Sequence, residues 1–361
     1  MTGHGIMLDR IIIFVVSLVG QNDREENIIF MEDVKYRGVT FADVDSEKAY
    51  AAAGRLTAEI EKIIVGKHRE VLLLVTALLA GGHVLIEDVP GVGKTTLAAA
   101  LARAAGLDFR RAQFTPDVTA SDITGFNIYN RKNESFDFTP GLVMTNILLA
   151  DEINRASPKT QSALLEAMEE CRVTVDGRTY ELPEPFMVIA TQNPSGFVGT
   201  YPLPEAQLDR FSLKLSMGYP TPDEEVRIVE SRGETSPLDS VKPVVGVKLI
   251  RFLRSLTADV HIDPALYKYI VSLVSATRTH RSVSLGASPR ASLALKRLSQ
   301  AYAFMHSRSY VVPEDVADIF RVSAAHRLLL TQEAKLAGVT SDDVISDVLK
   351  STPVPVRGES R

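Results

Sequence analysis

The folds open to this chain are restricted most by one segment, Pro90-Gly91-Val92-Gly93-Lys94-Thr95-Thr96. A short apolar run at 84–86 precedes it, and a helical pattern over 95–105 follows it. A glycine-rich turn between a strand and a helix is typical of a phosphate loop, because its backbone N–H groups surround an anion and the helix N-terminus adds positive potential. The segment therefore predicts a strand–loop–helix unit that binds the phosphates of a nucleoside triphosphate.

Residues of this loop have separate expected roles. Gly91 and Gly93 let the backbone approach the phosphates closely. Lys94 reaches the terminal phosphates, and the Thr95 hydroxyl is placed to ligate Mg²⁺. The full pattern also has a glycine six residues before the lysine, where this chain has Asp88. Because that outer glycine contributes least to phosphate contact, we keep this interpretation over a chance glycine-rich turn.

A second motif lies farther along the chain, where the apolar run 146–150 ends in Asp151 and Glu152. Such a run is typical of a central parallel strand that is covered on both faces. At its end Asp151 can hold a magnesium-bound water, and Glu152 can orient and deprotonate the attacking water. The alternative, two acids in a surface turn, fits poorly with the apolar residues before them. Together the two motifs predict hydrolysis of a nucleoside triphosphate with Mg²⁺.

Asn193 and Arg290 are candidates for contacts with the phosphates or the attacking water. Asn193 follows the apolar strand pattern 186–191, although an Asn before a proline is also common in turns. Arg290 lies two residues into the helix that begins at Ser288-Pro289, where a cation opposes the helix dipole. A bound phosphate would offset that unfavourable interaction; the alternative is a solvated arginine.

Arg210 lies just before the strand pattern 211–217. An arginine that reaches the γ-phosphate of a neighbouring subunit would stabilise the charge of the transition state. The alternative is an ordinary salt bridge within the chain, with Asp209 or Glu205 as the partner.

The order of apolar patterns predicts an α/β fold with three layers and a mostly parallel sheet. Strand and helix patterns alternate through the first part of the chain, up to residue 217. Two stretches of alternating residues, 126–138 and 172–182, interrupt this order. Asp176-Gly177 within the second stretch is a strong hairpin signal. We therefore expect two β-hairpins inserted into the sheet domain.

The pattern changes after Gly218, beyond which only helices are expected, beginning with the capping box that starts at Thr221. The chain is thereby divided into four expected segments. These are an N-terminal segment without a recognisable pattern (1–45), the α/β core (46–217), a small all-helical lid (218–345) and a loose C-terminal tail (346–361).

Composition argues against several classes of protein. The net charge of −5 does not favour a nucleic-acid binder. Cys171 is the single cysteine, which excludes a disulfide within the chain and fits a reducing cytosol; we expect it to be a small packing residue.

The apolar run 11–19 is far shorter than the ~20 residues that a spanning helix needs, so stable membrane insertion is not expected. A signal peptide is disfavoured because no small-x-small cleavage site follows the run. Two interpretations stay open: translation starting at Met31, and a surface strand or short anchor.

With these residues in place, the chain resembles the MoxR family of AAA+ ATPases over about residues 47–345. Two of the matching stretches distinguish this family from most other AAA+ proteins. The first contains DEINRA followed by PKTQSALLEAMEE, and the second is LPEAQLDRF. The segments that carry the resemblance are IEDVPGVGKTTLAAALA (86–102), QFTPDVTASDITG (113–125), ILLADEINRASPKTQSALLEAMEE (147–170), VIATQNP (188–194), YPLPEAQLDRF (201–211) and GASPRA (286–291).

The resemblance implies a role for each candidate residue. Lys94 and Thr95 match the family's Walker A motif, and Asp151 and Glu152 match its Walker B motif. Asn193 matches sensor 1, Arg210 the arginine finger and Arg290 the sensor 2 arginine. Val65 and Gly66 match a short segment near the adenine.

The resemblance also implies a hexameric ring with ATP between its subunits, and hairpins that face the central pore. From the single cysteine we expect a cytoplasmic protein, and from the two motifs we expect Mg²⁺ beside the ATP. The family's usual work is chaperone-like remodelling or maturation of protein complexes, often with partners that carry von Willebrand A domains, and sometimes for metal insertion. Two other functions stay open, a DNA-translocating motor and the ATPase subunit of a metal chelatase. Against the motor, no DNA-binding module or basic tail is appended, although the hairpin tip 130–133 is slightly basic.

Overall fold

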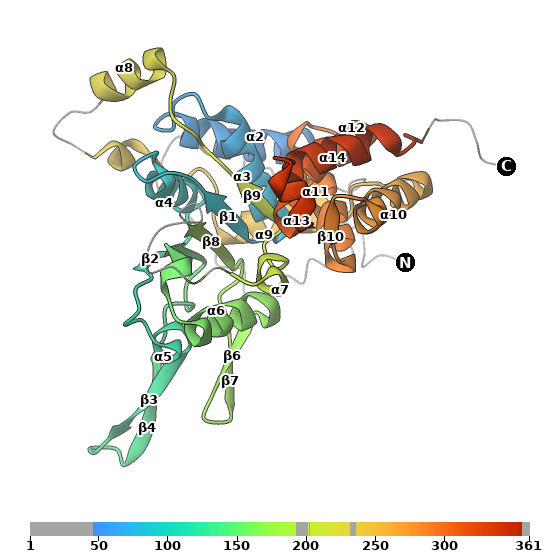
Figure 1. The fold of residues 1–361 in the computed structure, drawn as a ribbon. Coiled ribbons are helices and arrows are strands. Elements are labelled where there is room, and N and C mark those ends of the chain that lie inside the picture. The colour runs from blue at the N-terminus through green and yellow to red at the C-terminus, as the bar shows by residue number, and fades with distance from the viewer. Residues whose placement is uncertain (1–45, 193–200, 202, 232–235, 356–361) are drawn as a thin grey trace, which may run out of the picture.

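The computed structural model describes residues 46–192, 201, 203–231 and 236–355 (Figure 1). The predicted N-terminal segment 1–45, with its apolar run, lies outside the described residues, and so does Asn193. Within the described part of the chain, no helix has the length and apolar character needed to cross a membrane.

A five-stranded parallel sheet forms the centre of the α/β domain. The strands follow the order β2-β5-β8-β1-β9 across the sheet, so β8 lies between β5 and β1. Because parallel strands end at the same edge, the residues that follow β1, β5 and β8 lie close together. The strands are β1 Val84–Glu87, β2 Phe109–Gln113, β5 Ile147–Asp151, β8 Met187–Gln192 and β9 Leu213–Leu215, the last being shorter than predicted.

Helices cover both faces of this sheet, which confirms the predicted three layers. Successive side chains of a strand point to opposite faces. Leu85 and Leu148 accordingly belong to one buried cluster with α5 and α6, whereas Val84 and Ile147 belong to another with α2, α3 and α4. These helices are α2 Ser46–Glu61, α3 His68–Ala80, α4 Lys94–Ala104, α5 Ala120–Thr124 and α6 Pro158–Glu170.

The two predicted hairpins are present and project from the same side of the domain (Figure 1). They consist of β3 Gly125–Asn130 with β4 Ser135–Pro140, and of β6 Arg172–Val175 with β7 Arg178–Glu181. Asp176 and Gly177 adopt φ values of 48° and 79°, as a tight hairpin turn requires. The hairpins contact each other where the rings of Phe138 and Tyr180 stack with their centroids 3.8 Å apart.

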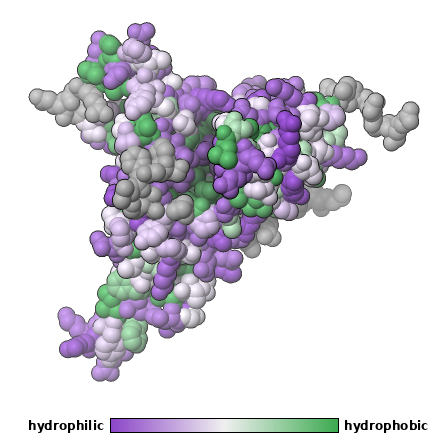
Figure 2. Space-filling view, viewed as in Figure 1, coloured by the Kyte–Doolittle hydropathy of each residue, from purple (hydrophilic) through white to green (hydrophobic). Residues whose placement is uncertain are grey.

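The longer hairpin, β3–β4, presents apolar side chains to solvent (Figure 2). Phe136 is 65% exposed and Ile128 is 51% exposed, which is unusual for large apolar residues that a fold could otherwise bury. These exposed apolar side chains flank the polar tip of the hairpin at residues 130–135.

The C-terminal part of the chain is mainly helical but not entirely so. Against the expectation of helices only, β10 Val283–Leu285 and β11 Leu329–Leu330 form a small antiparallel sheet. The tail also begins later than expected, because α14 continues to Ser351 instead of ending before residue 346. The helices are α8 Pro222–Ser231, α9 Val247–Ala258, α10 Pro264–Thr279, α11 Pro289–Met305, α12 Pro313–Ala324, α13 Gln332–Leu336 and α14 Ser341–Ser351.

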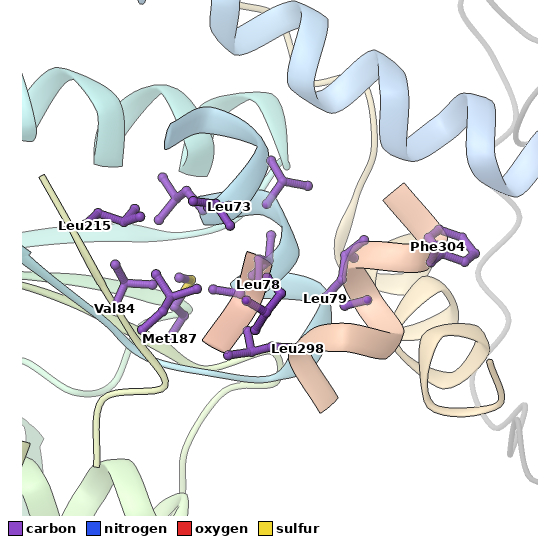
Figure 3. Packing of buried hydrophobic residues seen from close by; sticks show 14 of the residues in the cluster. Leu73, Leu78, Leu79, Val84, Met187, Leu215, Leu298 and Phe304 are labelled. Atoms are coloured by element: carbon purple, nitrogen blue, oxygen red, sulfur yellow. The ribbon is translucent and has the colours of Figure 1, made fainter. Parts of the chain in front are cut away.

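The helical domain packs on the α/β domain through α3, and the two share one continuous apolar cluster. Leu78 and Leu79 of α3 lie beside Leu298 and Phe304 of α11 (Figure 3). Helix α8 is the exception, since beyond its first turn it extends away from both domains (Figure 1). The predicted capping box is present at its start, where Thr221 and Glu224 exchange hydrogen bonds between backbone N–H and side chain.

Candidate functional site

The phosphate loop connects β1 to α4 as predicted. Gly91 and Gly93 have φ values of 89° and 93°, a region that residues with a side chain rarely adopt. The position beside Gly91 is open, with no atom within 4 Å of where a Cβ would lie. Helix α4 begins immediately after Gly93, so its N-terminal N–H groups point toward the loop. This geometry fits a bound phosphate.

Lys94 is the first residue of α4 and is largely buried. Its ammonium group donates a hydrogen bond to the backbone carbonyl of Asp88, with 2.7 Å between Nζ and O. Burial lowers the pKa of Lys94, and the carboxylates of Asp88, Asp151 and Glu152 partly offset that effect. The lysine thus places a cation at the loop, as phosphate binding requires.

Asp151 and Glu152 lie at the end of β5, next to β8, and Thr191 of β8 connects them. The Thr191 hydroxyl donates to Asp151 Oδ1 at 2.6 Å and accepts from the backbone N–H of Glu152 at 2.9 Å. Glu152 adopts a left-handed φ of 55°, and its carboxylate pairs with Arg155 at 2.9 Å. Arg111 of β2 pairs with Asp151 Oδ2 at 2.8 Å.

These donors fit Mg²⁺ and a triphosphate. Oxygen ligands are those that Mg²⁺ prefers, and it usually binds through one or two carboxylates together with the phosphates of the substrate. Asp151 supplies such a carboxylate, and Thr95, in the first turn of α4, supplies a hydroxyl. Asn193 lies outside the described residues, so its role stays a prediction.

Val65 and Gly66 lie where α8 begins. Gly66 has a φ of 74°, and the Glu224 carboxylate occupies the position that a Cβ of Gly66 would take. The neighbouring Lys67 donates from Nζ to the backbone carbonyl of Tyr219 at 3.2 Å. The segment expected near the adenine therefore contacts the connector between β9 and α8.

Arg210 and Arg290 lie together, away from the phosphate loop. Both pair with Glu169 near the end of α6, and the Arg210 Nη2 to Glu169 Oε2 distance is 3.2 Å. Arg210 therefore forms a salt bridge within the chain, but its partner is Glu169 and not Asp209 or Glu205, the two partners that the sequence suggests. Arg210 precedes β9, whose first residue is in register with the start of β1, whereas the loop follows the end of β1. Within one chain, Arg210 thus lies at the opposite edge of the sheet from the loop.

A cavity of about 820 Å³, lined by more arginines than carboxylates, surrounds this pair of arginines between α6 and the helical domain. Arg327 is 5% exposed, and its Nη2 donates to the backbone carbonyl of Phe211 at 2.7 Å. Burial lowers the pKa of Arg327 to about 10, and the nearby Asp209 partly offsets this. Six arginines line the cavity: Arg210, Arg251, Arg254, Arg290, Arg297 and Arg327.

Sequence reasoning missed Thr191, Arg111 and Glu169. The signal for Thr191 was available, because it is a polar residue within an otherwise apolar strand pattern. Nothing in the sequence indicates that Arg111 or Glu169 contacts the site, because their partners are distant in the chain. The expectation for Cys171 was wrong: it is exposed at the C-terminus of α6 with a φ of 51°, and it does not pack in the interior.

The fold and site geometry define a P-loop ATPase of the AAA+ class with an attached lid, and comparison with known proteins agrees. Residues 83–213 match the ATPase family associated with various cellular activities (AAA), and residues 275–348 match the AAA lid domain. The chain is 43% identical over 310 residues to the chaperone MoxR1 of Mycobacterium tuberculosis, covering 83% of this chain and 82% of that protein. This chain belongs to the MoxR family of AAA+ ATPases.

Two further relatives extend the comparison. The chain is 49% identical over 311 residues to YeaC of Bacillus subtilis, an uncharacterized protein, covering 86% of this chain and 97% of YeaC. It is also similar to the crystal structure of a candidate ATPase from Cytophaga hutchinsonii, with a TM-score of 0.80 and 37% identity. That match covers 86% of this chain and 97% of the other.

Proposed function

We propose that the protein hydrolyses ATP with Mg²⁺ at the phosphate loop and uses the energy to remodel a protein client. The observation that carries the proposal is the meeting of Lys94, Asp151 and Glu152 at one edge of the sheet, with Thr191 joining the two acids. Lys94 and the α4 N-terminus bind the phosphates, and Thr95 and Asp151 hold the Mg²⁺. Glu152 takes the proton of the attacking water, and Asn193 orients that water.

We further propose that the protein works as a ring, with six subunits as the family resemblance implies. Arg210 and Arg290 are separated by the whole sheet from the loop of their own chain, so neither supports that chain's own phosphates. A head-to-tail contact repeated around a closed ring would bring this edge of one subunit against the loop of the next. Both arginines would then stabilise charge on the neighbour's nucleotide.

The proposed client is a protein, with a partner that carries a von Willebrand A domain and a metalloprotein subunit as the two expected classes. The relative MoxR1 bears the name chaperone, and the exposed apolar side chains on the β3–β4 hairpin of this chain suit contact with a polypeptide.

Affinity capture with the Glu152→Gln variant tests this function. That variant should bind ATP without hydrolysing it, so it should retain the client in extracts of the source cells while ATP is present. Mass spectrometry would then identify proteins that are held with ATP and lost without it. Loss of the captured proteins on nuclease treatment would instead favour a DNA motor. Absence of Mg²⁺-dependent ATPase activity in the purified wild-type protein would contradict the proposal.

A further inference from the structure

Asp88 is the residue at which the phosphate loop departs from its usual pattern, and the structure shows what its side chain does. The residue is 7% exposed. Its carboxylate points away from the loop's open side to the three residues that follow β9. These residues, 216–218, begin the connector that leads through residues 219–221 to α8.

One carboxylate oxygen of Asp88 holds this connector with three hydrogen bonds. Oδ2 accepts from the backbone N–H of Met217 at 2.5 Å, from that of Gly218 at 2.7 Å, and from the Ser216 hydroxyl at 3.1 Å. Oδ1 accepts from the backbone N–H of Val89 at 2.8 Å. Gly218 has a φ of 60°, so the connector turns sharply at the contact. A glycine at position 88 would provide none of these side-chain acceptors.

The charge of Asp88 is suited to this contact. Burial alone would raise the pKa of Asp88, but the hydrogen bonds from Gly218, Val89, Ser216 and Met217 lower it below its ordinary value. The group therefore stays ionised at neutral pH, and hydrogen bonds to a charged acceptor are stronger than those between neutral groups.

The same residue also contacts the lysine of the loop, because its backbone carbonyl accepts from Lys94 Nζ. In a complex with ATP, Lys94 also binds phosphate, so the ammonium group that donates to the Asp88 carbonyl gains an anionic partner. Asp88 thus joins the group that senses phosphate to the connector. Farther along, Tyr219 of the connector accepts from Lys67, and Glu224 in the first turn of α8 lies against Gly66, so both reach the segment expected at the adenine.

We propose that Asp88 is a positioning residue that transmits nucleotide binding at the phosphate loop to the connector 216–221, and through it to α8. This inference rests on the proposed ATP hydrolysis. If it is right, Asp88 contributes to turnover through the placement of the connector, without touching the reacting atoms.

The test compares Asp88→Gly, which restores the usual loop residue, with the wild-type protein. Hydrogen exchange of residues 216–231 is measured with and without a non-hydrolysable ATP analogue, together with ATP affinity and steady-state kinetics. In the wild-type protein we expect the analogue to change exchange in this segment. In Asp88→Gly we expect ATP affinity within a few-fold of wild type, no analogue-dependent change in exchange, and a kcat lower by about tenfold to a hundredfold.

Two further variants distinguish positioning from a general loss of structure. Asp88→Asn keeps one oxygen acceptor for the connector and should recover part of both the kcat and the exchange response. Asp315→Asn is the control for a change at a buried carboxylate away from the loop: Asp315 in α12 accepts the backbone N–H of Val312 at 2.9 Å and also pairs with Arg308. This control should change neither the kcat nor the analogue-dependent hydrogen exchange of residues 216–231.

Each other outcome has a definite meaning. An unchanged kcat and exchange response in Asp88→Gly would overturn the inference and leave the ATPase proposal intact. Loss of nucleotide binding in Asp88→Gly would assign Asp88 to the fold of the loop and would also overturn the inference. A wild-type protein that binds ATP without hydrolysing it would contradict the proposed function itself.

Discussion

At the scale of single residues, the site depends on a few charged side chains that are buried. Lys94 is the clearest case, because it is buried next to carboxylates and yet stays aimed at the loop. Burying a lone ammonium group is costly, so a buried lysine that no carboxylate surrounded would lose its charge.

Replacing Lys94 with Ala should bring ATP binding below detection, because the loop then lacks its cation for the terminal phosphates. Binding of a fluorescent ATP analogue, followed in titrations with Mg²⁺, measures the effect. Lys62→Ala is a suitable control, since that lysine pairs with Glu59 on α2, away from the loop. An affinity equal to that of the wild-type protein would refute the assignment of the loop.

Thr191→Val should lower kcat by about tenfold with a smaller change in the KM for ATP, because the Glu152 N–H and Asp151 lose their shared partner. The same loss should reduce the free energy of unfolding by about 1–3 kcal/mol. Steady-state kinetics and denaturant titration measure the two effects. Thr76→Val, at a buried threonine of α3 that bonds to the Leu72 carbonyl, tests for a general effect of the substitution. Equal kinetics for the two variants would remove Thr191 from the site.

At the scale of elements, two buried histidines join strands to their neighbours. His83, before β1, accepts from the Val188 N–H of β8 at 2.9 Å, and its other nitrogen contacts the Met168 carbonyl of α6 at 3.0 Å. His326 contacts the Phe211 carbonyl ahead of β9 at 3.0 Å. Burial lowers the pKa of His83 to about 4 and that of His326 to about 3. Both elements are therefore held by neutral imidazoles.

Stability should consequently fall as the pH is lowered from about 6.5 toward 4. Between these values the unfolded chain binds protons at both histidines and the folded chain does not, so the free energy of unfolding decreases, by on the order of 3 kcal/mol for His83 alone. Denaturant titrations at several pH values measure the slope. His83→Gln should flatten it, whereas His261→Gln, at an exposed position, should not. Identical slopes for all three proteins would contradict this account.

The elements also show where sequence patterns succeed. The strands, the two hairpins and the major helices were predictable because their apolar periods are regular and their ends carry Gly, Pro or Asp-Gly signals. The β10–β11 sheet was not predictable, since it has three residues on one strand and two on the other. Strands this short have too few residues for a period of two to be recognised.

The same reasoning applies to the site. Lys94, Asp151 and Glu152 were found because their motifs are continuous in the sequence. Their supporting contacts were not found, since Thr191 and Asp151 are brought together by strand order and are distant along the chain. The pairing of Arg290 with Glu169 depends on how the helical domain packs, and that of Arg210 on how the chain returns beside α6; a sequence period determines neither.

At the scale of the whole molecule, the separation of Arg210 from the loop predicts the behaviour of mixed subunits. Arg210→Ala should bind ATP normally but turn it over about 10³-fold more slowly. Mixing it with Glu152→Gln subunits should restore part of the activity, because an intact Glu152 then meets an intact Arg210 across an interface. The readout is ATPase rate against mixing ratio.

Arg103→Ala provides the control for the mixing experiment. That arginine pairs with Asp239 at 3.0 Å on the outside of α4 and should leave turnover unchanged. Absence of any rescue in the mixture of Arg210→Ala with Glu152→Gln would assign Arg210 a structural role within its own subunit.

The pairing of Arg210 and Arg290 with Glu169 has a consequence for how activity depends on protein amount. In a lone subunit Glu169 balances the charge of these arginines, and on assembly the phosphates of the next subunit would become a competing counter-charge. Each complete centre then needs two chains, so the rate per chain rises with concentration until assembly is complete. A cell that changes the abundance of such a protein several-fold would change its total activity by a larger factor.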